Sequence, residues 1–163
     1  MRQLSVIAAA IAITAGLAGA QTIRAGVFDK QSVVVAFYRS PQWADLIKVK
    51  AAELDAAKKA NDTARGQELQ GWGGAQQELA HHQLAGEAPI ANIMEVLAPG
   101  LPEIARRAGV NLIASDLAFA DSAVQTVDVT EFLLAYLKAD SRTHSIILDL
   151  QKQRRQSKQS SAH

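Results

Sequence analysis

Two adjacent histidines, His81 and His82, come closest to a metal site in this sequence, with Glu78 and Glu87 nearby. Zinc sites combine histidine and carboxylate ligands that one element or fold brings together. Neighbouring residues of a helix point about 100° apart, so the two histidines cannot chelate one ion as an i, i+4 pair can. Glu78 and His82 have that spacing but supply only two ligands. We interpret the histidines as exposed residues and predict no metal site and no cofactor.

Two Ser/Asp pairs, Ser115-Asp116 and Asp121-Ser122, could belong to a hydrolase if His144 or the histidine pair completed a triad. The sequence has no G-x-S-x-G motif, which would place a serine nucleophile on a sharp strand-to-helix turn. Serine and aspartate are also common in turns, where their side chains bond the local backbone. We therefore predict no catalytic residues and no enzymatic activity.

The segment Gly71-Trp72-Gly73-Gly74 resembles a glycine-rich loop in composition. A phosphate-binding loop would need a strand before it and a lysine after it, and both are missing here. Three glycines in four residues are unfavourable inside a helix, by about 1 kcal/mol each relative to alanine. We predict that a helical hairpin turns back at this segment, with Trp72 exposed at its tip to contact a client or a membrane surface.

The elements that would carry these residues begin with a strand at residues 23–28, where apolar residues alternate. Residues 30–38 leave strand and helix open, because three consecutive valines favour a strand while Asp29 could cap a helix. Ser40-Pro41 predicts the start of a long helix. Its apolar stripe is narrow and rich in alanine, which favours packing in a hairpin or coiled coil.

After the glycine segment, the sequence predicts a second helical stretch from residue 75 to residue 84, and Pro89 suits the start of another helix. Residues 99–102 (PGLP) should interrupt that helix, and Gly109 is placed to end it in a left-handed conformation. Three strands are predicted at residues 110–115, 117–120 and 124–127, with a turn at residues 121–122. Asp128 and Glu131 have the spacing of a capping box, and a last amphipathic helix follows Ser141.

The first twenty residues have the pattern of a secretory signal peptide. Arg2 precedes an uncharged apolar run over residues 4–17, and Ala18-Gly19-Ala20 supplies the small residues that signal peptidase requires. The run is shorter than the ~20 apolar residues of a membrane span. We predict export to the periplasm with cleavage after Ala20.

Residues 21–150 are expected to form one domain, with a hairpin over residues 41–108. The chain has no cysteine, so packing or oligomerisation must stabilise it. Without Arg2, basic and acidic residues balance, which argues against nucleic-acid binding. Residues 151–163 are predicted to be a basic, disordered tail that could make weak contact with an anionic surface. Its cations are Lys152, Arg154, Arg155 and Lys158.

The order of these elements, together with the strings IRAGVFD and GVNLIASDLAFADSAVQTVDVTEFLLAYL, resembles the Skp/OmpH family of periplasmic chaperones over residues 22–138. The resemblance implies an α+β fold with a small β-sheet body and a protruding helical hairpin, here followed by C-terminal helices. It also implies that residues 30–38 are a short helix, and that three chains form a homotrimer whose arms enclose unfolded outer-membrane proteins.

By this resemblance the protein would be a non-enzymatic holdase that acts in outer-membrane protein assembly. An alternative is an envelope structural or adaptor protein that shares the fold and binds a folded partner or the cell wall. The candidate arm or client-contact residues are Leu46, Ile47, Leu54, Trp72, Leu79 and Ile93. The candidate residues of the oligomer body are Ile23, Val27, Val110, Leu112, Val124 and Val127.

Overall fold

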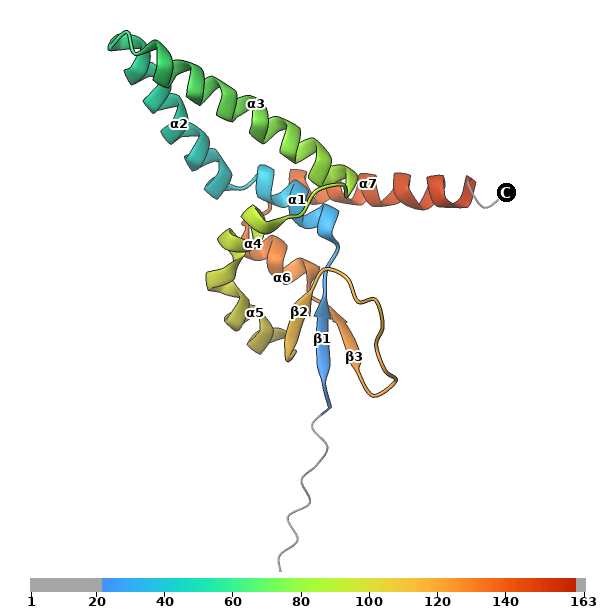
Figure 1. The fold of residues 1–163 in the computed structure, drawn as a ribbon. Coiled ribbons are helices and arrows are strands. Elements are labelled where there is room, and N and C mark those ends of the chain that lie inside the picture. The colour runs from blue at the N-terminus through green and yellow to red at the C-terminus, as the bar shows by residue number, and fades with distance from the viewer. Residues whose placement is uncertain (1–21, 161–163) are drawn as a thin grey trace, which may run out of the picture.

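The computed structural model describes residues 22–160, which combine helices with one small parallel sheet, an arrangement of the α+β class (Figure 1). The predicted signal peptide and its cleavage site lie outside the described residues. The sheet has the strand order β2-β1-β3, and both outer strands run parallel to the central one. The three strands are β1 (Arg24–Val27), β2 (Leu112–Ala114) and β3 (Gln125–Asp128).

The predicted strand at residues 117–120 is wrong, because these residues belong to the connection between β2 and β3. The side chain of Phe119 is 82% exposed, and no neighbouring strand pairs with this segment in the part of the chain that the structure describes. An isolated extended segment has no ladder to stabilise it. The turn expected at residues 121–122 is present, and there the Asp121 carboxylate accepts a hydrogen bond from the backbone N–H of Ala123.

Residues 30–38, for which the sequence left two conformations open, form helix α1 (Lys30–Tyr38). Every residue from 32 to 37 is buried, so other elements cover most of the helix surface. A helix that is apolar on all sides is stable only in such surroundings. Burial of the valines on all sides of α1 therefore outweighs their intrinsic preference for a strand.

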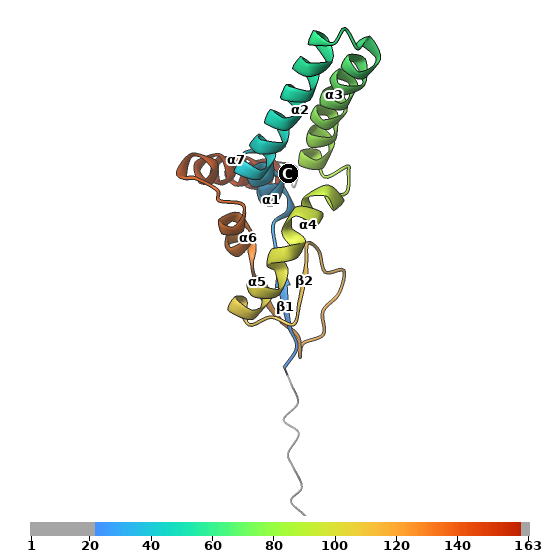
Figure 2. The same cartoon turned by 90° about the vertical axis from the view of Figure 1, so that its left-hand side faces the viewer.

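Helices α2 (Pro41–Lys59) and α3 (Thr63–Ala85) pack against each other as a hairpin that projects away from the sheet (Figures 1 and 2). The predicted start of α2 is confirmed: Pro41 is its first residue, and the Ser40 hydroxyl accepts a hydrogen bond from the Trp43 N–H at 3.1 Å. The tip lies at residues 60–62, where Asp62 caps α3 by accepting from the Arg65 N–H at 3.0 Å.

The predicted turn at residues 71–74 is therefore wrong, because these glycines lie inside α3. Each glycine makes the helix less stable by about 1 kcal/mol, but continued packing against α2 offsets that cost. The interruption does come at the shorter segment Asn61-Asp62, where Asn61 adopts a positive φ of 53°. Asparagine tolerates this left-handed conformation better than most residues, and aspartate is a preferred N-cap.

The glycines of α3 provide a direct test of this account. A methyl group added at Gly71, Gly73 or Gly74 would meet no heavy atom within 4 Å. We expect the triple replacement by alanine to raise the free energy of unfolding by about 2 kcal/mol, measured by urea denaturation followed by circular dichroism. The matched control is Gly100→Ala, where the added methyl would collide with the ring of Tyr136 and should destabilise the fold. Destabilisation by the triple change would contradict a continuous α3.

The chain returns to the sheet through short helices. The left-handed Gly86 (φ 81°) ends α3, and α4 (Ala91–Leu97), the 3-10 turn η1 (Ala98–Gly100) and α5 (Leu101–Ala108) follow. The interruption predicted at residues 99–102 is confirmed by η1. Gly109 has φ 64°, so the predicted left-handed end of α5 is also confirmed.

Helix α6 (Thr130–Tyr136) begins two residues after Asp128, with Val129 at the N-cap position. The expectation that Asp128 is the N-cap is therefore wrong by one residue. Asp128 is the last residue of β3, although its carboxylate still accepts a hydrogen bond from the Thr130 N–H at 2.8 Å. Pairing of Asp128 with Val27 extends the strand to this residue, so the helix starts later.

The hydrophobic core lies where α1 meets the short helices and the carboxyl end of β1. Its fully buried members come from several elements, so no single amphipathic pattern in the sequence describes it. The largest are Ile93, Leu97, Leu133, Leu134 and Leu137. No helix in the described part of the chain is both long and apolar enough to cross a membrane.

The last helix, α7 (Ser141–Ser160), continues through residues 151–160. This corrects the prediction of a disordered tail over that range; residues 161–163 lie outside the described part. The Arg154 guanidinium forms two hydrogen bonds with the Asp29 carboxylate, at 2.7 and 3.1 Å. Gln151 donates to the Ser32 hydroxyl at 3.2 Å. These contacts join the helix to the start of α1 and explain why a polar sequence is ordered here.

The Asp29–Arg154 pair predicts an acid-dependent loss of stability. Burial raises the pKa of Asp29, but its bonds with Arg154, Ser32 and Gln151 outweigh this effect and lower the pKa from 3.8 to about 2. Because the folded-state pKa is the lower one, the stabilisation is complete above about pH 4 and is lost as pH falls towards 2. We expect Asp29→Asn to destabilise the protein by about 1 kcal/mol at pH 7, since solvent screens the pair. Urea midpoints should show this difference shrinking as pH falls from 4 to 2, and a constant difference would contradict it.

Candidate functional site

The seam between the two hairpin helices is narrow and contains two stacked tryptophans. Trp43 of α2 and Trp72 of α3 have ring centroids 6.2 Å apart and planes inclined by 28°. Further along, Ala57 and Leu69 are buried between the helices. The prediction that Trp72 is exposed at the tip is wrong, because α3 starts nine residues before it and carries it back along α2. Trp72 is half-buried and holds the hairpin together.

Charged side chains border this seam. The Lys50 ammonium lies 5.9 Å from the Trp72 ring centroid and forms an ion pair with Glu53 at 3.1 Å. Glu53 also binds Arg65 of α3 at 2.6 Å, and these two cations lower the pKa of its carboxyl group. Glu53 thus connects the two helices. Partly exposed pairs of this kind contribute modestly to stability, but they fix how the helices align.

The root of the hairpin is an aromatic cluster joined to the body. Trp43 contacts the rings of Phe37 and Tyr38, with centroid distances of 5.6 and 4.9 Å. Trp43 also packs against the hydrophobic core and so anchors the base of the arm. The hairpin is therefore attached through packed aromatic rings, which favours a fixed direction of projection.

A buried glutamine, Gln83, also fastens the end of the hairpin, and sequence reasoning missed it. It accepts a hydrogen bond from the Tyr38 hydroxyl at 2.8 Å. Its amide donates to the Pro89 carbonyl at 2.8 Å and to the Asn92 side chain at 2.7 Å. The side chain is fully buried, so these bonds satisfy a group that would otherwise be costly to bury. A single glutamine in a polar helix gives no sequence signal for this role.

Apolar residues of α2 remain exposed along the hairpin. Leu46 and Ile47 are 39% and 40% exposed, and the nearby Val49 is 55% exposed. With 3.6 residues per turn, Leu46 and Ile47 fall on opposite flanks of the stripe that faces α3. These three exposed apolar residues, Leu46, Ile47 and Val49, lie on both flanks of α2 and are together called the arm patch below. These side chains offer apolar surface on the hairpin that could contact another apolar chain.

The other predicted arm residues are less available. Leu54 and Leu79 are half-buried. Ile93 is 0% exposed and belongs to the core, so its prediction as a client-contact residue is wrong. It lies on α4, which has already left the hairpin and packs against the body. Apolar residues at helical spacing occur both in an arm helix and in a core helix, so the spacing cannot tell which of the two Ile93 belongs to.

The residues predicted to form an oligomer body divide between surface and core. Ile23 and Leu112 are exposed at the sheet, and Val27, Val124 and Val127 are half-buried. Val110 is buried within its own chain, and the sheet does not present it to a partner. Strands β2 and β3 each pair only with β1 in the described residues, so both outer edges of the sheet have unpaired backbone groups.

The polar residues considered for chemistry are spread over the molecule. His82 contacts the Glu87 carboxylate at 2.7 Å, and its other ring nitrogen lies 3.9 Å from Glu78. The described residues contain no group of three or more metal-ligating side chains. Ser115 lies 3.3 Å from Asp116, which pairs with Lys30. His144 instead pairs with Glu131, at 3.8 Å.

The described residues thus combine a small parallel sheet with a projecting helical hairpin that exposes apolar side chains. Comparisons of this chain with protein-family models, with curated proteins and with solved structures found no match.

Proposed function

We propose that this protein is a non-enzymatic, holdase-type chaperone of the Skp/OmpH kind that acts in the periplasm on unfolded or outer-membrane proteins. The observation that carries the proposal is the hairpin formed by α2 and α3, which projects from the sheet-containing body and exposes the arm patch. Exposed apolar groups on a projecting element can contact a client without forming a deep pocket.

Such a protein would act by mass action. An unfolded client exposes apolar segments that associate with one another at micromolar concentrations. Binding these segments to the arm patch lowers the free concentration of the unfolded state and so slows aggregation. This action needs neither catalytic groups nor a cofactor.

Association of three chains would make this surface more effective, because several arms could hold one client. Two features support a homo-oligomer, which we propose is a trimer. The outer edges of β2 and β3 have unpaired backbone groups. Ile23 and Leu112 expose apolar surface at the same sheet. Joining sheets from several chains would cover both features.

The proposal is tested with the chain lacking residues 1–20. Multi-angle light scattering should give the mass of three chains, and a porin diluted from urea should scatter less light when the protein is present at one trimer per porin. A monomeric chain with no effect on porin aggregation would contradict the proposal.

A pull-down from envelope extract separates this function from that of an adaptor. Recovery of a mixed set of unfolded porins is expected for a chaperone. Recovery of one folded partner in stoichiometric amount would instead favour an envelope adaptor that shares this fold.

A further inference from the structure

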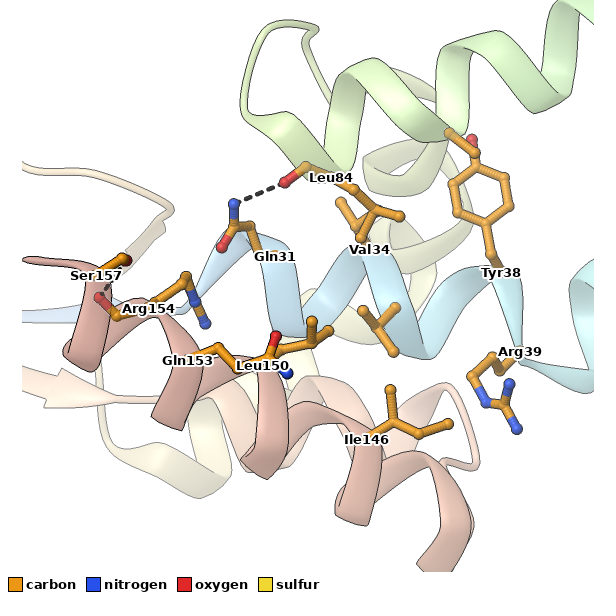
Figure 3. A pocket seen from close by; sticks show the side chains of 12 residues that line it. Gln31, Val34, Tyr38, Arg39, Leu84, Ile146, Leu150, Gln153, Arg154 and Ser157 are labelled. Carbon is orange, nitrogen blue, oxygen red and sulfur yellow. Dashed lines mark hydrogen bonds between the residues drawn. The ribbon is translucent and has the colours of Figure 1, made fainter.

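An apolar groove of about 580 Å³ lies between α1, the end of α3 and α7 (Figure 3). Its volume lies within the range of about 300–1,000 Å³ that is typical of small-molecule sites. The groove follows α1 from Gln31 to Tyr38, a distance of about 10 Å at 1.5 Å per residue. Aliphatic side chains from all three helices line it: Val34, Val35, Ala80, Leu84, Ile146 and Leu150.

Most polar groups at the groove already have partners. Gln31 donates to the Leu84 carbonyl at 2.6 Å, and the Tyr38 hydroxyl donates to Gln83 at 2.8 Å. Arg154, at one end, is held by the Asp29 carboxylate. A peptide in this groove would therefore bury backbone N–H and C=O groups with few partners, which is costly. An alkyl chain has no such groups.

The opposite end of the groove has a different electrostatic character because of Arg39. The Arg39 Nε donates to the Thr143 hydroxyl at 3.2 Å. Among the described residues, its two terminal amino groups have no hydrogen bond and no ion pair. Hydrogen bonds from Thr143 lower the pKa of Asp140, and the nearby charge of Arg39 adds to this effect, but no ion pair joins Arg39 to that carboxylate among the described residues. No acidic residue lines the groove.

We propose that this groove binds the anion of a fatty acid, with the alkyl chain along Leu84, Ile146 and Leu150 and the carboxylate at Arg39. The alkyl chain would displace water from aliphatic walls, which is favourable in proportion to the apolar area covered. The planar guanidinium can donate two parallel hydrogen bonds to a carboxylate. A cation at one end of an apolar groove matches the charge at one end of an apolar chain.

This site lies beyond the proposed chaperone function and does not depend on it. The groove uses α1, α7 and the end of α3, whereas the arm patch lies on α2. The fatty acid and an unfolded client would therefore contact different surfaces. Aggregation assays and fatty-acid titrations can succeed or fail independently.

Isothermal titration calorimetry of the chain lacking residues 1–20 with dodecanoate, kept below the concentration at which it forms micelles, tests the proposal. We expect saturable binding of one dodecanoate per chain. Arg39→Gln should weaken binding about tenfold or more, whereas Arg39→Lys should retain much of it. Arg155→Gln removes the same charge from α7 outside the groove lining and should bind like the unaltered chain.

Two further measurements locate the alkyl chain. Ala80→Phe fills the groove from α3 and should reduce dodecanoate binding at least tenfold, provided that its circular dichroism spectrum and melting temperature remain close to those of the unaltered chain. Methyl chemical shifts of Val34, Val35 and Leu150 should change on titration. Dodecyl maltoside, which has an alkyl chain of nearly the same length and an uncharged head group, should bind at least tenfold more weakly.

The following results would overturn the proposal: no saturable binding of dodecanoate, equal binding by Arg39→Gln and the unaltered chain, or equal binding of dodecanoate and dodecyl maltoside. Methyl shifts confined to the arm patch would also overturn it, because they would place the fatty acid on α2. If Arg39→Gln does not fold, the Ala80→Phe titration and the comparison of the two amphiphiles still decide the question.

Discussion

Replacing Ile93 with alanine is expected to lower the free energy of unfolding by about 2–5 kcal/mol, because the side chain is fully buried and its loss leaves a cavity in the core. Urea denaturation should show a lower midpoint with an unchanged slope, the pattern of a change in stability alone.

The matched control for Ile93→Ala is Ile47→Ala, which removes the same atoms from a side chain that is 40% exposed. We expect it to change stability by less than about 1 kcal/mol, as at most surface positions. If the two variants had equal stability, Ile93 would have to lie on the arm surface, and the position of α4 in the core would be wrong.

The largest expected effect on activity comes from removing apolar surface at the arm patch. Complete burial of a leucine or isoleucine contributes about 1.5–3 kcal/mol, and Leu46 and Ile47 each retain about two-fifths of their surface. Each can therefore contribute about 1 kcal/mol to client binding. The double variant Leu46→Gln, Ile47→Gln should need roughly ten- to thirtyfold more protein for the same suppression of porin aggregation.

Glutamine suits this test because it is a good helix former, so α2 should remain intact. The control removes apolar surface elsewhere: Leu148→Gln on α7 combined with Phe119→Gln in the β2–β3 connection, both exposed positions. This control should suppress aggregation like the unaltered protein. If both double variants lost activity equally, client binding would depend on general surface hydrophobicity and not on the hairpin.

Local features of the sequence predicted several boundaries correctly. Ser40-Pro41 starts α2, and Gly109 ends α5 with a positive φ. In each case the residue acts on its own backbone or on the first turn beside it, so the effect does not depend on distant parts of the chain. The mixed helical and strand composition followed from similar local patterns.

Other features depended on packing between distant segments. The three glycines of residues 71–74 predicted a break, but contact with α2 keeps the helix continuous to Ala85. Trp72 lies against Trp43, so it is part of the seam and not an exposed tip. Each glycine inside a helix lowers the helix stability by about 1 kcal/mol relative to alanine. Packing across the helix–helix interface can offset an effect of this size.

The order of α7 at residues 151–160 also depended on contacts that the sequence does not reveal. Its charged composition indicated a solvated tail. In the structure, however, Arg154 forms an ion pair with Asp29, which lies more than a hundred residues earlier in the chain. The same packing creates the groove with Arg39 at its end. An ion pair between residues far apart in the chain produces no periodic pattern in the sequence. Neither periodicity nor composition could therefore predict it.

The sequence by itself determined the α+β class, the first strand, the start of the hairpin and the helix end at Gly109. These are set by alternation, capping and backbone conformation over a few residues. The tertiary structure decided where the hairpin turns, which apolar residues face solvent, and how α7 encloses a groove. Those features depend on the free energy of contacts between segments far apart in the chain, which a local pattern does not contain.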